Sequence, residues 1–135
     1  MDSTDPAELE ALFELGTESS GYSVDLFLIR ALGSAVGISG GIPGPPGRHG
    51  LTHAGVAVTA QADCLLTSLG RIMAHEVGHH LGLFHTNVGD VATDPIADTD
   101  LSTTNLMDQF GRGTEVTAGQ GYVVRRNPDI IGTSE

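Results

Sequence analysis

A single stretch of this chain, residues 75–85, has the residue types and the spacing needed to bind a metal ion. It reads His-Glu-Val-Gly-His-His-Leu-Gly-Leu-Phe-His. Residues four apart share one face of a helix and lie about 6 Å apart along its axis. His75 and His79 can therefore both reach one zinc ion, at bond lengths of about 2.0–2.1 Å. The spacing predicts a helix that carries a pair of imidazole ligands.

Three further residues of this stretch bear on whether such an ion is catalytic. His85 follows His79 by too many residues to face the same ion from a continuous helix. Gly82 can adopt the left-handed conformation that ends helices, which lets the chain bring His85 back to the ion. Glu76 lies beside the ion and can take a proton from water held there. Three protein ligands with an open fourth position are typical of catalytic zinc, so we expect zinc on His75, His79 and His85, with Glu76 as general base.

The other three histidines fall outside this pattern. Helical spacing turns His80 away from the ion, so we expect a histidine on the side of the helix without a metal role. His49 and His53 lie in a segment rich in Gly and Pro, and we interpret them as surface residues or as residues at the rim of a substrate site. An inactive zinc site with the same three histidines is an alternative, because the ligands alone do not determine activity.

The pattern of residues 75–85 resembles that of the metzincin zinc metallopeptidases. Metzincins also carry a methionine turn below the metal, and Asn105-Leu106-Met107-Asp108 is the candidate here, with Met107 as its methionine. Residues 94–99 and 105–107 look similar to the pappalysin-like branch and to related bacterial secreted metzincins. The resemblance covers about residues 69 to 128.

The resemblance implies an α+β fold, with a small twisted mixed sheet packed on the active-site helix. A single catalytic domain, 1–135, would have an upper subdomain over about 1–82 and an irregular lower subdomain over about 83–135 that ends in a helix. It further implies a secreted zinc endopeptidase that is a monomer and acts on peptide or protein substrates.

Two departures from the family pattern keep an alternative open. In several metzincin branches a tyrosine follows the methionine by two residues and steadies the transition state, whereas this chain has Gln109 there and its nearest later tyrosine is Tyr122. The chain is also short for the family. The alternative is a non-catalytic, zinc-stabilised binding module derived from a shortened metzincin domain. A third alternative is hydrolysis of a non-peptide amide.

The composition of the chain argues against several classes of binding partner. The net charge is −11, from 17 acidic and 6 basic residues, which argues against nucleic acid and anionic membranes. No apolar run approaches the roughly 18 residues that a membrane span needs, and the acidic N-terminus does not have the pattern of a signal peptide. The one cysteine, Cys64, cannot form an internal disulfide, and we expect it to be a small buried apolar residue.

The first half of the chain must supply the sheet. Asp5 and Pro6 can cap and open a helix whose apolar face continues to Phe13. Residues 22–32 predict an interior strand covered on both faces. Residues 34–39 predict either an edge strand that pairs with an extended substrate or part of a rigid surface loop, and residues 55–60 predict a second strand.

The second half must supply the metal-binding helix and the segment below it. We expect Thr67 or Ser68 to cap this helix. After His85 the chain reads as mostly irregular until a capping box at Thr117–Gln120 opens a helix that runs through Arg126 and ends before Pro128. Carboxylates in the irregular part also suit calcium, although their spacing matches no EF-hand; they are Asp90, Asp94, Asp98, Asp100 and Asp108.

Overall fold

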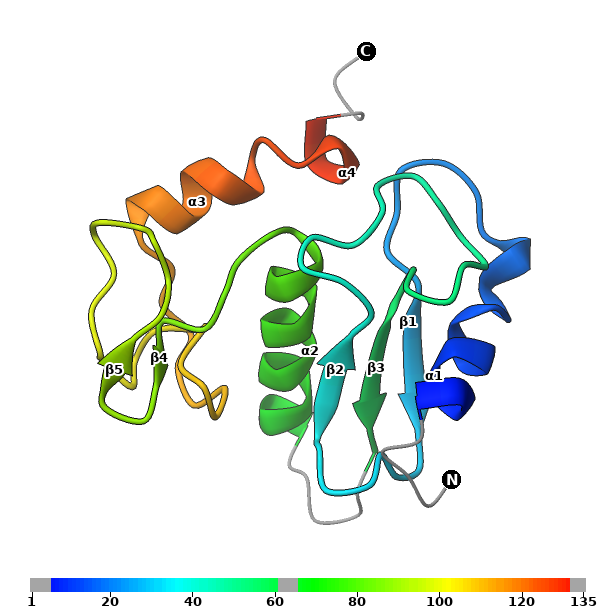
Figure 1. The fold of residues 1–135 in the computed structure, drawn as a ribbon, viewed down its shortest axis with the longest axis horizontal. Coiled ribbons are helices and arrows are strands. Elements are labelled where there is room, and N and C mark those ends of the chain that lie inside the picture. The colour runs from blue at the N-terminus through cyan, green and yellow to red at the C-terminus, as the bar shows by residue number, and fades with distance from the viewer. Residues whose placement is uncertain (1–5, 61–65, 132–135) are drawn as a thin grey trace.

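The structure, a computed structural model, describes residues 6–60 and 66–131 and has a mixed α+β fold (Figure 1). Its elements in chain order are α1 (Pro6–Phe13), η1 (Gly16–Glu18), β1 (Leu26–Ile29), β2 (Gly37–Ser39), β3 (Val56–Thr59), α2 (Leu66–His80), β4 (Asn87–Val88), β5 (Val91–Ala92), α3 (Ala118–Val124) and α4 (Pro128–Ile131). The three-stranded sheet lies on one side of α2, and β4 and β5 lie on the other (Figure 1). Within the described ranges, no helix is long and apolar enough to cross a membrane.

The three-stranded sheet has the order β1-β3-β2, so β3 is its interior strand. β1 pairs with β3 in parallel, with Leu26 opposite Val56, and β2 pairs with β3 antiparallel, with Gly37 opposite Val58. All four residues of β3 are buried. The small and β-branched side chains of β3 suit a strand that is paired on both sides and covered by α2.

The prediction of an interior strand over residues 22–32 was therefore wrong in its place in the sheet and in its length. The strand that forms there, β1, has four residues and lies at the edge of the sheet, with Leu28 56% exposed. An apolar run on both faces does not by itself distinguish an interior strand from an edge strand whose outer face is left open. The edge strand predicted over residues 34–39 is present as β2.

Helix α1 lies against the sheet through its last residue. The Phe13 ring is fully buried and contacts the Phe27 ring of β1, with 5.8 Å between centroids. This agrees with the predicted apolar face, and Pro6 is the first helical residue as expected. The predicted cap Asp5 and the predicted buried Cys64 lie outside the described residues.

Helix α2 begins at Leu66, so the prediction of Thr67 or Ser68 as its cap was wrong, because both residues lie within the helix. Its other end matches the prediction. Gly82 has a φ of 106°, its N–H donates to the carbonyl of His79, and the N–H of Leu83 donates to the carbonyl of Gly78. These two bonds form a Schellman motif, which ends the helix and turns the chain toward His85.

The segment after His85 has more regular structure than the sequence suggested. β4 and β5 form an antiparallel hairpin around Gly89, which has a φ of 60°. Helix α3 begins at the predicted capping box: Thr117 accepts from the backbone of Gln120 while the Gln120 side chain accepts from the backbone of Thr117. α3 ends at Val124, and a short additional helix, α4, begins at Pro128, where proline is favoured as a first helical residue.

Candidate metal centre

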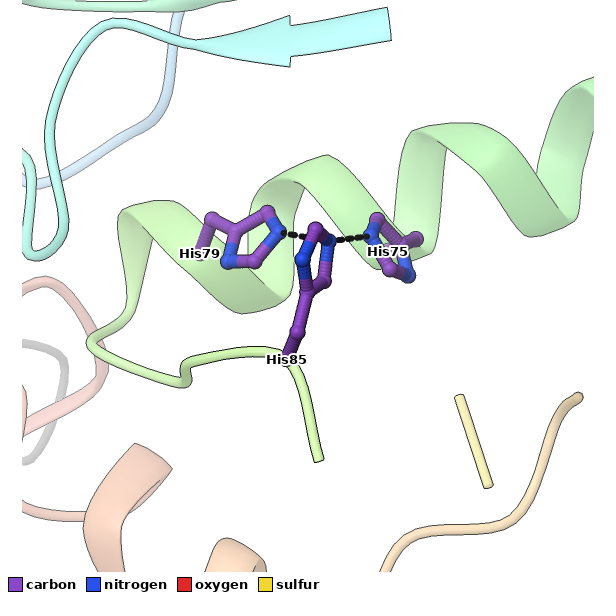
Figure 2. Close-up of side chains that lie close together, drawn as sticks. All are labelled: His75, His79 and His85. Atoms are coloured by element: carbon purple, nitrogen blue, oxygen red, sulfur yellow. Dashed lines mark hydrogen bonds between the residues drawn. The ribbon is translucent and has the colours of Figure 1, made fainter. Parts of the chain in front are cut away.

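Three imidazoles from two segments converge on one point (Figure 2). His75 and His79 project from the same face of α2, and His85 comes from the segment that follows the turn at Gly82. The Nε2 atom of His85 lies 3.1 Å from Nε2 of His75 and 3.0 Å from Nε2 of His79. The predicted convergence of these three rings is therefore present.

Backbone carbonyls fix the orientation of two of these rings. The Nδ1 atom of His75 lies 2.6 Å from the carbonyl oxygen of Leu106, and Nδ1 of His79 lies 2.7 Å from that of Leu83. A carbonyl oxygen only accepts hydrogen bonds, so each Nδ1 must carry the proton. In the neutral ring, Nε2 then has a free lone pair that faces the point of convergence, as in histidines that bind metals.

This arrangement fits a cation better than it fits hydrogen bonds among the rings. Burial lowers the pKa of His79 to about 4 and lowers the pKa values of His75 and His85, so the neutral form is favoured at neutral pH. A single N–H on Nε2 of His85 can serve only one of its two close nitrogen contacts. Tetrahedral ligands with bonds of about 2.0–2.1 Å lie roughly 3.3 Å apart, close to the distances found here. The three histidines can therefore share one metal ion.

Glu76 lies next to the histidine cluster in a nearly closed environment. It is 7% exposed, and its carboxylate accepts a hydrogen bond from the backbone of Ser39 in β2. Burial raises the pKa of Glu76 to about 7, and the bond from Ser39 opposes this rise. A cation at the histidines would lower the pKa again, because an opposite charge favours the carboxylate.

Glu76 and the cluster open onto one cavity of about 450 Å³. Its lining includes residues 34–37, which end in the first residue of the edge strand β2, and residues 109–111. Ile72, His75, Glu76 and His85 complete its lining. The cavity is therefore lined by two of the possible metal ligands, by the Glu76 carboxylate and by residues at the edge of the sheet.

The predicted methionine turn lies directly against α2. Met107 is fully buried, and a Cβ added to Gly78, which lies between His75 and His79 in α2, would come 2.6 Å from its Sδ atom. The helix can approach the methionine this closely only because residue 78 has no side chain. Sequence reasoning treated position 78 as unconstrained.

Position 109, where several metzincin branches carry a tyrosine, is occupied here by a glutamine. Gln109 lines the cavity, but its Oε1 atom accepts from the N–H of Gly89 at 3.0 Å. Tyr122 lies on α3, is 55% exposed and stacks on Arg126. In the described part of the chain, Tyr122 is not among the residues that line this cavity.

The remaining histidines lie apart from the cluster. His80 is buried and its Nε2 atom lies 3.3 Å from a carboxylate oxygen of Asp129. His49 is more enclosed than predicted, because its ring lies between Asp25 and the carbonyl of Gly21 at 2.9 Å from each. His53 is exposed, and neither His49 nor His53 lines the cavity next to Glu76 in the described residues.

The aspartates considered for calcium do not form a group. Within residues 6–60 and 66–131, the three histidines are the only set of three or more His, Cys, Asp or Glu side chains close enough to share an ion. Several of these aspartates accept hydrogen bonds from other residues of the chain. Asp98 accepts from Gly119 and Thr117 at the start of α3, and Asp108 binds Arg112 through both oxygens.

Gly37 is a residue of the site that sequence reasoning missed. A Cβ at this position of β2 would lie 2.7 Å from Cγ of Glu76. A glycine within a strand often marks such a close approach, and this was the only available signal.

Comparison with known proteins finds no matching family model, no matching curated protein and no matching solved structure.

Proposed function

We propose that this chain is a zinc-dependent endopeptidase with a metzincin-like fold. The observation that carries the proposal is that His75, His79 and His85 converge on one point, and that two of them, His75 and His85, line a cavity together with Glu76. The donor set supports zinc, because three neutral imidazoles with one position left for water are typical of catalytic zinc sites. The turn at Gly82 and the packing of Met107 against α2 support the metzincin-like arrangement.

Hydrolysis of a peptide bond at this site would need a Lewis acid and a general base. A zinc ion on the three histidines would supply Lewis acidity, lowering the pKa of water and polarising a carbonyl group. Glu76 would take the proton of the attacking water on a carboxylate oxygen and deliver it to the nitrogen of the leaving amine. Its hydrogen bond from Ser39 would hold the carboxylate in place between these two transfers.

The cavity walls support an extended peptide as substrate. β2 is an edge strand, and an edge strand can pair with an extended chain through its free N–H and C=O groups. The residues that lead into it line the cavity beside Glu76. A substrate strand lying there would place a backbone carbonyl close to the histidines. We further propose that the protein acts as a secreted monomer.

Metal analysis combined with cleavage of a mixed peptide library tests this proposal. The zinc-loaded protein should cleave peptides internally, and Glu76→Gln should retain zinc while losing about 10²–10⁴-fold in rate, the usual contribution of a general base. Gly70→Ala serves as a control on the same helix, because a Cβ at Gly70 meets no atom within 4 Å. Parental rates in Glu76→Gln would refute the assigned base.

The second candidate is a zinc-stabilised binding module without activity. It is favoured by position 109, where the side chain is bound to Gly89 and offers no hydroxyl to a transition state. A zinc-loaded protein that cleaves no member of the library, yet melts when the metal is removed, would support the module over the enzyme.

A further inference from the structure

Two buried amides, Asn105 of the methionine turn and Gln120 of α3, bind each other. Nδ2 of Asn105 donates to Oε1 of Gln120 at 3.0 Å, and Nε2 of Gln120 donates to Oδ1 of Asn105 at 3.1 Å. Asn105 is 4% exposed and Gln120 is fully buried. An amide taken out of water costs free energy unless its polar atoms are bonded, so this reciprocal pair tolerates few other arrangements.

Each amide of the pair also binds the backbone of its own segment. Oδ1 of Asn105 accepts from the N–H of Met107 at 2.8 Å. Oε1 of Gln120 accepts from the N–H of Thr117 at 3.0 Å, as part of the capping box that begins α3. The pair therefore joins the first turn of α3 to the backbone of the methionine turn.

Two backbone carbonyls of the methionine turn accept hydrogen bonds, one from His75 and one from the residue that follows His85. The carbonyl of Leu106 accepts from Nδ1 of His75 at 2.6 Å. The next carbonyl, that of Met107, accepts from the N–H of Thr86 at 2.9 Å, and Thr86 directly follows His85. Consecutive carbonyls of one turn thus orient the ring of His75 and anchor the backbone that carries His85.

We propose that Asn105 and Gln120 are positioning residues of the metal centre, which hold the Leu106 and Met107 carbonyls where His75 and His85 need them. Neither amide lines the cavity in the described residues, so neither has a direct role in chemistry. Groups that orient metal ligands typically change metal affinity by about 10- to 100-fold when they are removed. The inference rests on the metal-binding part of the proposed function and does not require hydrolysis.

Zinc affinity, measured by competition with a chelating dye, tests the inference. Asn105→Ala removes the acceptor for the N–H of Met107, and we expect the dissociation constant for zinc to rise by about 10- to 100-fold. Gln120→Glu keeps the oxygen that accepts from Thr117 but removes the donor to Asn105, and we expect a rise in the same range. The double variant should lose no more than the larger single effect, because the two amides act as one unit.

Asn127 provides a matched control. It is also a buried asparagine, and its Oδ1 atom accepts from the backbone N–H two residues later, that of Asp129, at 2.9 Å. Asn127→Ala should lower the melting temperature of the protein but leave its zinc affinity unchanged, since this turn binds none of the three cluster rings. Zinc affinity is measured only under conditions in which circular dichroism shows the variant to be folded. If Asn105→Ala does not fold, the zinc affinity of Gln120→Glu tests the positioning role.

Three results would overturn the inference: parental zinc affinity in the folded Asn105 and Gln120 variants, an equal loss in Asn127→Ala, or a parent that binds no zinc. Its failure is separable from that of the proposed function. A parent that binds zinc but cleaves no peptide refutes the endopeptidase, and the dissociation constants still judge the positioning role. A parent that cleaves peptides while the variants keep full affinity refutes the positioning role alone.

Discussion

Gly37 of β2 lies so close to Glu76 of α2 that a Cβ on residue 37 would be 2.7 Å from Cγ and 2.8 Å from Oε1 of the glutamate. The backbone of the edge strand therefore forms one side of the pocket that holds the carboxylate. The neighbouring Ser39 donates its N–H to the same side chain. A strand expected to bind substrate thus also sets the position of the expected general base.

The first prediction concerns Gly37→Ala. The added methyl group must displace the flexible end of Glu76 rather than backbone, so we expect a folded protein with parental zinc affinity. Misplacement of a catalytic group by about 1 Å can cost about 10²-fold in rate, and we expect a loss of about 10- to 100-fold in peptide cleavage. Steady-state kinetics with a peptide from the library measures it.

Gly70→Ala is the matched control for this substitution. It lies on α2, where a Cβ meets nothing within 4 Å, and it should keep the parental rate while slightly stabilising the helix. Equal rates in the Gly37 variant and the parent would show that the close approach of residues 37 and 76 has no functional consequence.

The features of the site that could be predicted from sequence are local ones. The ligand spacing on α2, the helix stop at Gly82 and the capping box of Thr117 and Gln120 each depend on residues within a few positions of one another. Their geometry follows from helix periodicity and from the backbone freedom of glycine. Such features need no knowledge of how distant segments pack.

The features that could not be predicted depend on distant segments. The contact of Gly37 with Glu76 and the pair of Asn105 with Gln120 follow from packing that no spacing rule contains. The edge position of β1 and the interior position of β3 have the same cause, because both segments are short and apolar, and only tertiary pairing shows which one is interior. The β4–β5 hairpin is different: Gly89 and Asp90 between two valines are a turn signal that the sequence reading missed.

The second prediction concerns pH and His49. Both ring nitrogens of His49 face acceptors, the carbonyl of Gly21 and the carboxylate of Asp25, and only the protonated ring can donate to both. These bonds raise the pKa of His49 above its ordinary value of 6.5. The resulting stabilisation is complete below the unfolded pKa and is lost as the pH rises through the folded pKa.

His49→Gln should therefore lower the melting temperature more at about pH 5.5 than at about pH 9. Comparing variant with parent at each pH cancels the contributions of other titrating groups, including Glu76. His53→Gln, at an exposed histidine of the same loop, is the matched control for the substitution itself. A His49 variant that loses equal stability at both pH values would contradict the protonated pair.

The third prediction concerns Arg112 and Asp108. The Arg112 side chain donates to both oxygens of the fully buried Asp108 carboxylate, at 2.8 Å each, and holds the pKa of Asp108 below its ordinary value. Arg112→Ala leaves this buried acceptor without its charged donor. Since the arginine is half exposed, water can replace part of the bond. We expect the free energy of unfolding, measured by urea denaturation, to be lower than that of the parent.

The control for Arg112→Ala is Arg48→Ala, at another exposed arginine, which should change the free energy of unfolding by less than about 0.5 kcal/mol. The Arg112 guanidinium also lies 4.8 Å above the ring of Phe110 in the cavity wall. If the two arginine variants are equally stable, the ion pair with Asp108 contributes nothing that water does not supply.

The last prediction concerns removal of the metal. It compares His79, a proposed zinc ligand, with His80, the next residue of the same helix. Zinc at 100 times its dissociation constant should stabilise the protein by about 2.7 kcal/mol, and a chelator should abolish this gain. His79→Ala should eliminate the zinc-dependent rise in melting temperature. His80→Ala should keep that rise on a less stable protein, because Oδ2 of the buried Asp129 carboxylate loses its histidine partner while Oδ1 keeps the N–H of Gly47. A zinc-dependent rise that persists in His79→Ala, or disappears in His80→Ala, would mean that the ion binds elsewhere than at the convergence of His75, His79 and His85.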